Sequence, residues 1–374
     1  MKVSPEILNL VPYKPGKPIS ETKREYGLTD VIKLASNENP LGMSPKAKQA
    51  VIRQLEEGHR YPDASYYELC EKVSQKWNVP LNQIVIGNGS DELIDLLVRI
   101  YCEPRESIVI PEKSFVAYSV RAGASRVRVQ TTPLKAGYQV DFEALSTFLR
   151  EKRESTSTRL VFLANPNNPT GVYCPADQVE AFLAEFGNHP DLLIVFDEAY
   201  NEFVRAKDYR SGQSFMTQYK NIVVLRTLSK AYGLAGLRVG VMMAPAETAE
   251  LAHRVRTPFN VSELSQAAAI AALDDDDFIR KTCEATWQGL DYFYQQLSLL
   301  GLPYIESQGN FVMFDTLRDV VEVNEALLRK GVILRPVLNY GFKTEMRLSV
   351  GLPHENQRAI AALKQVLNEI KPCK

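Results

Sequence analysis

A lysine follows a predicted buried strand in the segment TLSKAYGLAGLRVG. The apolar run IVVL at 222–225 precedes Lys230, and Arg238 comes eight residues after this lysine. A lysine that loses contact with water has a lowered pKa and can act as a nucleophile or a base. The hydroxyls of Thr227 and Ser229, together with the guanidinium of Arg238, can hold a phosphate. The segment therefore predicts a reactive amine beside an anion site.

A second apolar run, LLIVF, ends in an acidic residue. Asp197 follows this run directly, and Tyr200 comes three residues later. Burying a carboxylate is costly unless a cation or a metal pairs with it. No histidine stands nearby to complete a metal site, so a protonated nitrogen of a ligand is the favoured partner. The alternative is that Asp197 caps the next helix, and its sequence context alone is compatible with both.

Two further loops follow apolar runs. The loop PNNPTG holds the amide of Asn168 at the edge of the predicted sheet, or it is only a turn rich in proline and asparagine. The run IVIG leads into GNGSDELIDLLVRI, where the N–H groups of Gly89, Ser90 and Asp91 can face an anion at the start of a helix. This turn lacks the third glycine of a dinucleotide motif and the Gly-Lys pair of a P-loop, which argues against both kinds of nucleotide site.

Together these loops offer an amine nucleophile, a buried carboxylate, hydrogen-bonding Asn and Tyr side chains, and a phosphate cradle. Pyridoxal 5′-phosphate requires all of them. Its aldehyde combines with a lysine, and its ring nitrogen stays protonated beside an aspartate. Its phosphate needs N–H groups, hydroxyls and an arginine. Four strand-end loops that suit one cofactor are more specific than any single motif, and they predict an enzyme that uses pyridoxal phosphate.

The elements that must position these residues recur along the chain. Short apolar runs without strict alternation are separated by helical stretches, as expected when helices cover both faces of a sheet. The runs lie at 84–87, 107–110, 126–129, 160–165, 192–197, 221–227 and 239–243. They predict an α/β domain with a mostly parallel seven-stranded sheet, in which ligands bind beyond the carboxyl ends of the strands.

The pattern changes after about residue 260. Strands near 310–315, 331–337 and 346–351 and an amphipathic C-terminal helix predict a small α+β domain, and the run DDDD at 274–277 is typical of a helix start. A cation site at this run is the less favoured alternative. We expect an N-terminal arm over 1–30, a large cofactor-binding domain over 31–262 and a small domain over 263–374.

Composition limits the classes of function. The 374 residues carry a net charge of −1, which argues against a protein that binds nucleic acid or a membrane surface. The five cysteines form no CxxC pair and fit reduced thiols, and the four histidines show no metal-ligand spacing. There is no candidate signal peptide or transmembrane span. We expect a cytoplasmic protein without a metal, whose partner is a small molecule.

Seven blocks resemble, in order, the signature blocks of fold-type-I pyridoxal-phosphate aminotransferases, in particular the histidinol-phosphate aminotransferase family. They are SNENPLG, HRYPD, GNGSDE, NPNNPTG, DEAYNEF, LSKAYGLAGLRVG and RLSVG, and the resemblance covers nearly the whole chain. It implies the exchange of an amino group between glutamate and imidazole acetol phosphate, which gives 2-oxoglutarate and histidinol phosphate by a ping-pong mechanism. It also implies a homodimer with shared active sites.

The resemblance implies a role for each matching residue. Lys230 would bind the cofactor covalently and move a proton at the substrate Cα, Asp197 would pair with the pyridinium, and Phe115 would stack on the ring. Tyrosine is frequent at the position of Phe115, and its absence removes one possible hydrogen bond. The other cofactor contacts would come from Gly89, Ser90, Asp91, Asn168, Tyr200, Thr227, Ser229 and Arg238, and from Tyr61, which would reach the cofactor of the neighbouring subunit.

The resemblance also implies a substrate site. Arg347 matches the arginine that clamps an α-carboxylate, and Arg335 resembles the residue that reaches the substrate phosphate, although a surface or dimer contact is its alternative. Tyr13 and Asn37 are assigned to the substrate as well. Leu352 stands where the family usually has a polar residue, and the sequence offers no mechanistic reason for it.

Several other functions share part of these signals. An aromatic amino-acid aminotransferase acting on Phe or Tyr would carry the same cofactor motifs, and so would a decarboxylase of a phosphorylated amino acid such as threonine phosphate. A non-catalytic pyridoxal-phosphate sensor would need an added basic DNA-binding module. A dehydrogenase would need GxGxxG after its first strand, where only GNG is found.

Overall fold

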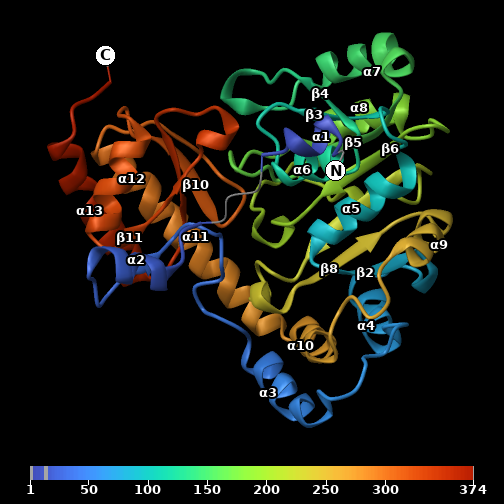
Figure 1. Cartoon of the computed structure of the whole chain (residues 1–374), viewed down its shortest axis with the longest axis horizontal. Helices are drawn as coiled ribbons and strands as arrows, with labels where there is room; N and C mark the ends of the chain where they lie inside the picture. The colour runs from blue at the N-terminus through green and yellow to red at the C-terminus, as the bar shows by residue number, and fades with distance from the viewer. Residues whose placement is uncertain (1–2, 12–15, 374) are drawn as a thin grey trace.

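The computed structural model describes residues 3–11 and 16–373, and its larger part is built around a seven-stranded sheet (Figure 1). The strands are β2 (Ile84–Asn88), β3 (Ser107–Pro111), β4 (Arg128–Thr132), β5 (Thr158–Ala164), β6 (Leu193–Asp197), β7 (Ile222–Thr227) and β8 (Val239–Met243). Their order is β2-β8-β7-β6-β5-β3-β4, and β8 runs antiparallel to both of its neighbours while the other pairs are parallel. The predicted mostly parallel sheet is confirmed.

One predicted strand is displaced. The run 126–129 was expected to be extended from its first residue, but β4 begins at Arg128. Arg126 has a φ of 61°, in the left-handed region, and its carbonyl accepts a hydrogen bond from the Arg105 amide. Residue 126 therefore belongs to the turn before the strand, because a left-handed residue cannot continue an extended backbone.

Helices cover both faces of the sheet, which explains the absence of strict alternation in its strands. One face is covered by α5 (Ser90–Tyr101), α6 (Ala117–Ala124) and α9 (Ala246–Val255), which share one hydrophobic core with it. The other face packs against α3 (Pro45–Gln54), α4 (Tyr67–Trp77), α7 (Phe142–Thr156), α8 (Ala176–Phe186) and α10 (Glu263–Leu273). The carboxyl ends of β5, β6 and β7 are left open between these layers.

The smaller part contains a four-stranded antiparallel sheet in the order β12-β13-β10-β9. Its strands are β9 (Tyr304–Ile305), β10 (Phe311–Asp315), β12 (Arg335–Pro336) and β13 (Glu345–Ser349), and its helices are α11 (Asp276–Leu299), α12 (Val320–Arg329) and α13 (Pro353–Glu369). The predicted helix start at the DDDD run is confirmed, since Asp275 is the N-cap of α11. The predicted strands and C-terminal helix are confirmed as well.

The N-terminal segment contains α1 (Pro5–Leu8), α2 (Ile19–Tyr26) and β1 (Ile32–Lys33), and β1 pairs with β11 (Val332–Ile333) of the smaller part. Short 3₁₀ turns lie at Leu55–Glu57, Leu81–Gln83, Ala136–Tyr138, Asn201–Phe203, Gly212–Phe215, Ala235–Leu237 and Leu338–Tyr340. Among the described helices, none combines the length and apolar character that crossing a membrane requires.

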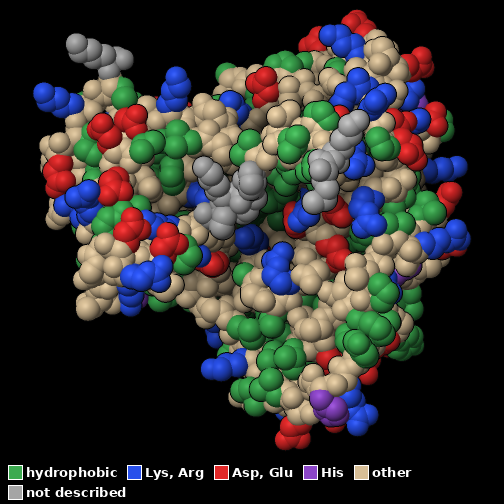
Figure 2. Space-filling view, viewed as in Figure 1, with side chains coloured by type: hydrophobic (Ala, Val, Ile, Leu, Met, Phe, Trp, Pro, Cys, Tyr) green, Lys and Arg blue, Asp and Glu red, His purple; other side chains and the backbone are tan. Residues whose placement is uncertain are grey.

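The domain boundaries at residues 30 and 262 remain a proposal. Ile32 and Leu34 lie in the core of the smaller part with Phe293 and Leu348, whereas α10, which follows residue 262, packs into the core of the larger part. The segment just after residue 30 therefore packs with the smaller part, and the helix just after residue 262 packs with the larger part. The space-filling view shows this face of the molecule hollowed between the two parts, with Lys and Arg side chains in the hollow (Figure 2).

Candidate active site

One cavity, of about 390 Å³, brings together most of the residues singled out in the sequence. It lies where β5, β6 and β7 end, and it is closed by β12, β13 and the segment before α3. The predicted residues that line it are Asn37, Ser90, Asp91, Phe115, Asn168, Asp197, Tyr200, Thr227, Ser229, Lys230, Arg238, Arg335 and Arg347. Residues more than 300 positions apart in the chain therefore meet at one site.

Lys230 stands three residues after the end of β7 and points across the cavity. Its Nζ donates a hydrogen bond of 3.1 Å to the carbonyl oxygen of Ser36. Burial, and to a smaller extent the positive charge of Arg347, lower the pKa of Lys230 to about 8. A lysine with this pKa has an appreciable neutral fraction at neutral pH, so it can act as a nucleophile and as a base.

Asp197 ends β6 and is buried. Its Oδ2 accepts a hydrogen bond of 2.8 Å from the hydroxyl of Tyr118, and its Oδ1 has no hydrogen-bond partner among the described residues. Burial raises the pKa of Asp197 to about 6, although the hydrogen bond from Tyr118 opposes this shift. A buried acceptor of this kind needs a donor, and the ring N–H of pyridoxal phosphate would supply one. The alternative of a helix cap does not hold, since a 3₁₀ turn follows with Tyr200 as its N-cap.

A hydrogen-bonded group of side chains lines the same cavity as Asp197. Tyr200 accepts a hydrogen bond of 2.9 Å from the Asn37 amide, which leaves the Tyr200 hydroxyl proton to be donated into the site. Asn168 uses its Oδ1 to accept from Arg347, so its Nδ2 is the donor that remains. Two donors are thus available for the phenolic oxygen of the expected cofactor, while Asn37 itself contacts Tyr200 and Ser349.

The expected phosphate cradle forms between the start of α5 and the chain after β7. Arg238 donates to the Ser229 hydroxyl at 3.4 Å, and the Ser229 amide donates to the Thr227 hydroxyl at 3.2 Å. Gly89 has a φ of 76°, and a Cβ there would lie 2.3 Å from the Arg238 guanidinium. Only glycine fits at this position, which lets the arginine approach the N-terminus of α5.

Arg335 and Arg347 face each other on neighbouring strands of the small sheet. They are direct partners in the antiparallel register of β12 and β13, so both side chains are on the same face of the sheet and line the cavity. Arg347 also donates to the Ala35 carbonyl at 2.7 Å and lies over the Phe311 ring. Two guanidinium groups on one wall of a cavity are suited to a doubly charged ligand.

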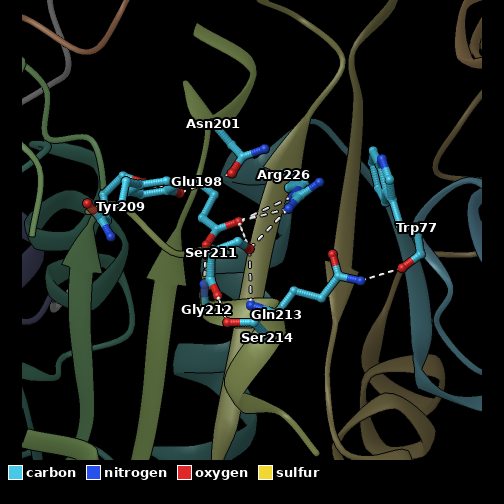
Figure 3. Close-up of polar contacts among 10 residues, drawn as sticks. Trp77, Glu198, Asn201, Tyr209, Ser211, Gly212, Gln213, Ser214 and Arg226 are labelled. Carbon is cyan, nitrogen blue, oxygen red and sulfur yellow. Dashed lines mark hydrogen bonds and ion pairs between the residues drawn. The ribbon is translucent and has the colours of Figure 1, made fainter. Parts of the chain in front are cut away.

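A second polar group lies behind the site and was not predicted. Glu198 is fully buried and forms an ion pair with Arg226 at 3.1 Å, with the Ser211 hydroxyl donating to Glu198 at 2.7 Å (Figure 3). Arg226 also lies over the Trp77 ring at 5.0 Å. Glu198 follows Asp197 and points to the opposite face, so the ion pair ties the end of β6 to β7 beneath the cavity.

Tyr61 was predicted to reach the neighbouring subunit, and that role stays a prediction. Tyr61 is 83% exposed and stacks on Phe259 with ring centroids 4.7 Å apart, so it does not reach the cavity of its own chain. Tyr13 lies outside the described residues. Gly89 shapes the cradle next to Ser90, and Phe115 lines the cavity beside Tyr118.

Sequence reasoning missed Tyr118 and Arg121, which both lie on α6. Tyr118 donates a hydrogen bond to Asp197, and Arg121 lines the cavity. Their spacing of three residues, one turn of a helix that begins beside Phe115, is a signal that could have revealed them. Within residues 3–11 and 16–373, no group of His, Cys, Asp and Glu side chains could hold a metal ion.

The fold and the lysine-centred site are those of an aminotransferase: the chain belongs to the class I and II aminotransferase family, whose model matches residues 29–363. It is 60% identical, over 100% of both chains, to a histidinol-phosphate aminotransferase from Bdellovibrio bacteriovorus. It is 41% identical to histidinol-phosphate aminotransferase 2 from Pasteurella multocida over 98% of each chain.

A solved structure of histidinol-phosphate aminotransferase from Sinorhizobium meliloti in complex with pyridoxal 5′-phosphate superposes with a TM-score of 0.87, at 26% identity and with 98% of each chain covered. The resemblance drawn from the sequence blocks is therefore confirmed, and so is the predicted fold.

Proposed function

We propose that this protein transfers an amino group between glutamate and imidazole acetol phosphate, with pyridoxal 5′-phosphate as its cofactor, and so forms histidinol phosphate. The observation that carries the proposal is the facing pair Arg335 and Arg347 on the wall of a cavity that also holds Lys230. Two guanidinium groups are suited to a substrate phosphate, and the relative at 60% identity carries the name of this activity.

The cavity residues fit the cofactor. Asp197 would hold the ring nitrogen, Asn168 and Tyr200 would donate to the phenolic oxygen, and Phe115 would cover the ring. The phosphate would lie among the start of α5, Ser229 and Arg238. When bound, pyridoxal phosphate supplies an aldehyde that takes up the amino group and a ring that accepts the electrons left at Cα.

Lys230 performs the proton transfers. Its neutral amine would take the proton from the substrate Cα and deliver it to the reacting carbon of the cofactor in one half of the reaction, and it would move a proton in the reverse direction in the other half. A pKa of about 8 suits both roles, since the same nitrogen must be a base and then an acid near neutral pH. Burial of the amine keeps bulk water away from the proton in transit.

The two arginines serve different substrates in turn. Arg347 binds the α-carboxylate of glutamate by two parallel hydrogen bonds in the first half-reaction. Imidazole acetol phosphate has no α-carboxylate, so its phosphate lies between Arg347 and Arg335 in the second half-reaction. One site thereby accepts two anions of different shape.

The first test is the half-reaction of the aminated enzyme. The purified protein is converted to its amino form with glutamate, and the return of the aldehyde absorbance is followed after adding imidazole acetol phosphate or phenylpyruvate. We expect a strong preference for the phosphate compound. We also expect Arg335→Met to lower the second-order rate constant for that compound by about 100-fold, as for loss of a charge-assisted contact. The value for phenylpyruvate should change little.

Arg329→Met is the matched control, because Arg329 is an exposed arginine of the same part of the chain, paired with Glu325. If phenylpyruvate reacts as well as the phosphate compound, the protein is an aromatic aminotransferase and the role of Arg335 is wrong. Release of CO₂ from a phosphorylated amino acid would instead identify a decarboxylase.

We further propose a cytoplasmic homodimer in which Tyr61 of each subunit enters the cofactor site of the other. The exposure of Tyr61 and its stacking on the half-exposed Phe259 support a contact with another chain.

The cytoplasmic location is supported by the cysteines. All five are unpaired, as expected in a reducing compartment.

A further inference from the structure

Arg121 is a cation in the cavity wall to which neither the sequence blocks nor the mechanism assigns a role. It lies in the second turn of α6 and lines the same cavity as Ser229 and Arg238. Its guanidinium forms an ion pair with the carboxylate of Asp91, in the first turn of α5. The ion pair therefore joins two helices beside the groups that are suited to the cofactor phosphate.

The place of Asp91 explains why it needs a partner. The first N–H groups of α5 and the positive end of its dipole favour a bound anion. The Asp91 side chain puts a negative charge at the same helix end, where it would repel a phosphate dianion. About a third of each side chain is exposed, 37% for Arg121 and 36% for Asp91, so water weakens this repulsion without removing it.

We propose that Arg121 is a positioning residue for the cofactor phosphate, and that it acts by neutralising the Asp91 carboxylate and holding it in the ion pair. The proposal rests on the assignment of pyridoxal phosphate as the cofactor. Arg121 acts through Asp91, so its effect must disappear when Asp91 carries no charge. This dependence separates it from Arg238, which approaches the cradle directly.

The test is the affinity of the cofactor-free protein for pyridoxal phosphate at low ionic strength, measured by absorbance titration. We expect Arg121→Met to raise the Kd about tenfold, as for an unscreened charge near a dianion, and the increase to shrink in 0.5 M salt. The double variant with Asp91→Asn should return to within about twofold of the parent, because an asparagine side chain at this position removes the charge and leaves the backbone N–H in place. Asp91→Asn alone should bind at least as tightly as the parent.

Arg99→Met is the matched control. Arg99 pairs with Asp95 at 3.7 Å on the same helix, and neither residue lines the cavity. Like Arg121→Met, this variant removes one positive charge and leaves a carboxylate of α5 without its partner, but away from the cavity, so its Kd should equal that of the parent. A second control is pyridoxal, which lacks the phosphate, and Arg121→Met should leave its affinity unchanged.

Each other outcome overturns the proposal. If Arg121→Met weakens pyridoxal and pyridoxal phosphate equally, the ion pair only holds the two helices together. If the Kd of the cofactor is unchanged and the KM of a substrate rises, Arg121 binds substrate. If the double variant stays as weak as Arg121→Met, the effect does not pass through Asp91. If the parent protein does not bind pyridoxal phosphate, the cofactor assignment is overturned. If the parent binds it and Arg121→Met binds it with the same Kd, only this inference is overturned.

Discussion

At the scale of the residue, the surroundings decide what Lys230 can do. An exposed lysine has a pKa of about 10.4 and is almost fully protonated at neutral pH. Burial at the end of β7, together with the like charge of Arg347, lowers the pKa of Lys230 to about 8. The same side chain thus becomes a nucleophile because of its position.

This pKa predicts a pH dependence for cofactor uptake. The neutral amine attacks the aldehyde, so the rate of pyridoxal-phosphate binding to the cofactor-free protein should rise with pH through about 8, as measured by stopped-flow absorbance. Arg347→Met should move the midpoint to higher pH, because it removes a positive charge. Lys48→Met, at an exposed lysine, should not move it. A midpoint near that of a free lysine would contradict the assignment.

At the scale of the element, the carboxyl ends of β6 and β7 are fastened together. Asp197 is the last residue of β6, and Glu198 follows it directly. Their side chains point to opposite faces, because successive residues of an extended chain alternate. Asp197 faces the cavity, while Glu198 pairs with Arg226 of β7 beneath it (Figure 3). The ion pair holds the two strand ends that carry Asp197 and Lys230.

Removal of one partner should therefore be costly. Glu198→Gln leaves the buried Arg226 without a compensating charge, and we expect the free energy of unfolding to fall by about 3 kcal/mol, measured by urea denaturation. The control is Glu250→Gln, which breaks an ion pair with Arg254 whose side chains are 66% and 67% exposed, and which should cost less than about 1 kcal/mol. Equal effects of the two variants would show that the buried ion pair does not stabilise the site.

At the scale of the whole molecule, the cavity exists only where the two parts of the chain meet. The sheet of the larger part contributes Asp197 and Lys230, while Asn37 and Arg347 come from segments that pack in or beside the smaller part. Lys113, two residues before Phe115, donates to the Tyr340 carbonyl at 2.7 Å and so ties the two parts beside the cavity. The proposed dimer would add Tyr61 from outside.

The proposed sharing of sites predicts complementation between two defective variants. Lys230→Ala and Tyr61→Ala are each purified and then mixed under conditions that exchange subunits. In the mixed dimer, the site that keeps Lys230 receives an intact Tyr61 from the other subunit, so the activity should exceed the sum of the separate variants. If Tyr61 acted within its own chain, mixing would produce no gain in activity.

Much of this architecture is readable from local sequence. Apolar runs predict the strands because a strand covered on both faces must be apolar throughout, and polar residues directly after the runs mark the ligand-binding edge. The predicted start of β4 was wrong, because the left-handed turn at Arg126 depends on the hydrogen bond of this residue with Arg105, which local sequence does not reveal. Tyr118 was missed because its partner, Asp197, lies 79 positions away.

The sequence by itself determined the α/β class, the order of the strand-end loops, the reactive lysine and the family blocks, since these depend on periodicity and on residue types close together in the chain. Only the tertiary structure decided that Arg335 and Arg347 face each other, that Glu198 pairs with Arg226 and that Arg121 meets Asp91. Those contacts depend on strand register and helix packing, which arise from the burial of distant apolar surfaces rather than from any local pattern.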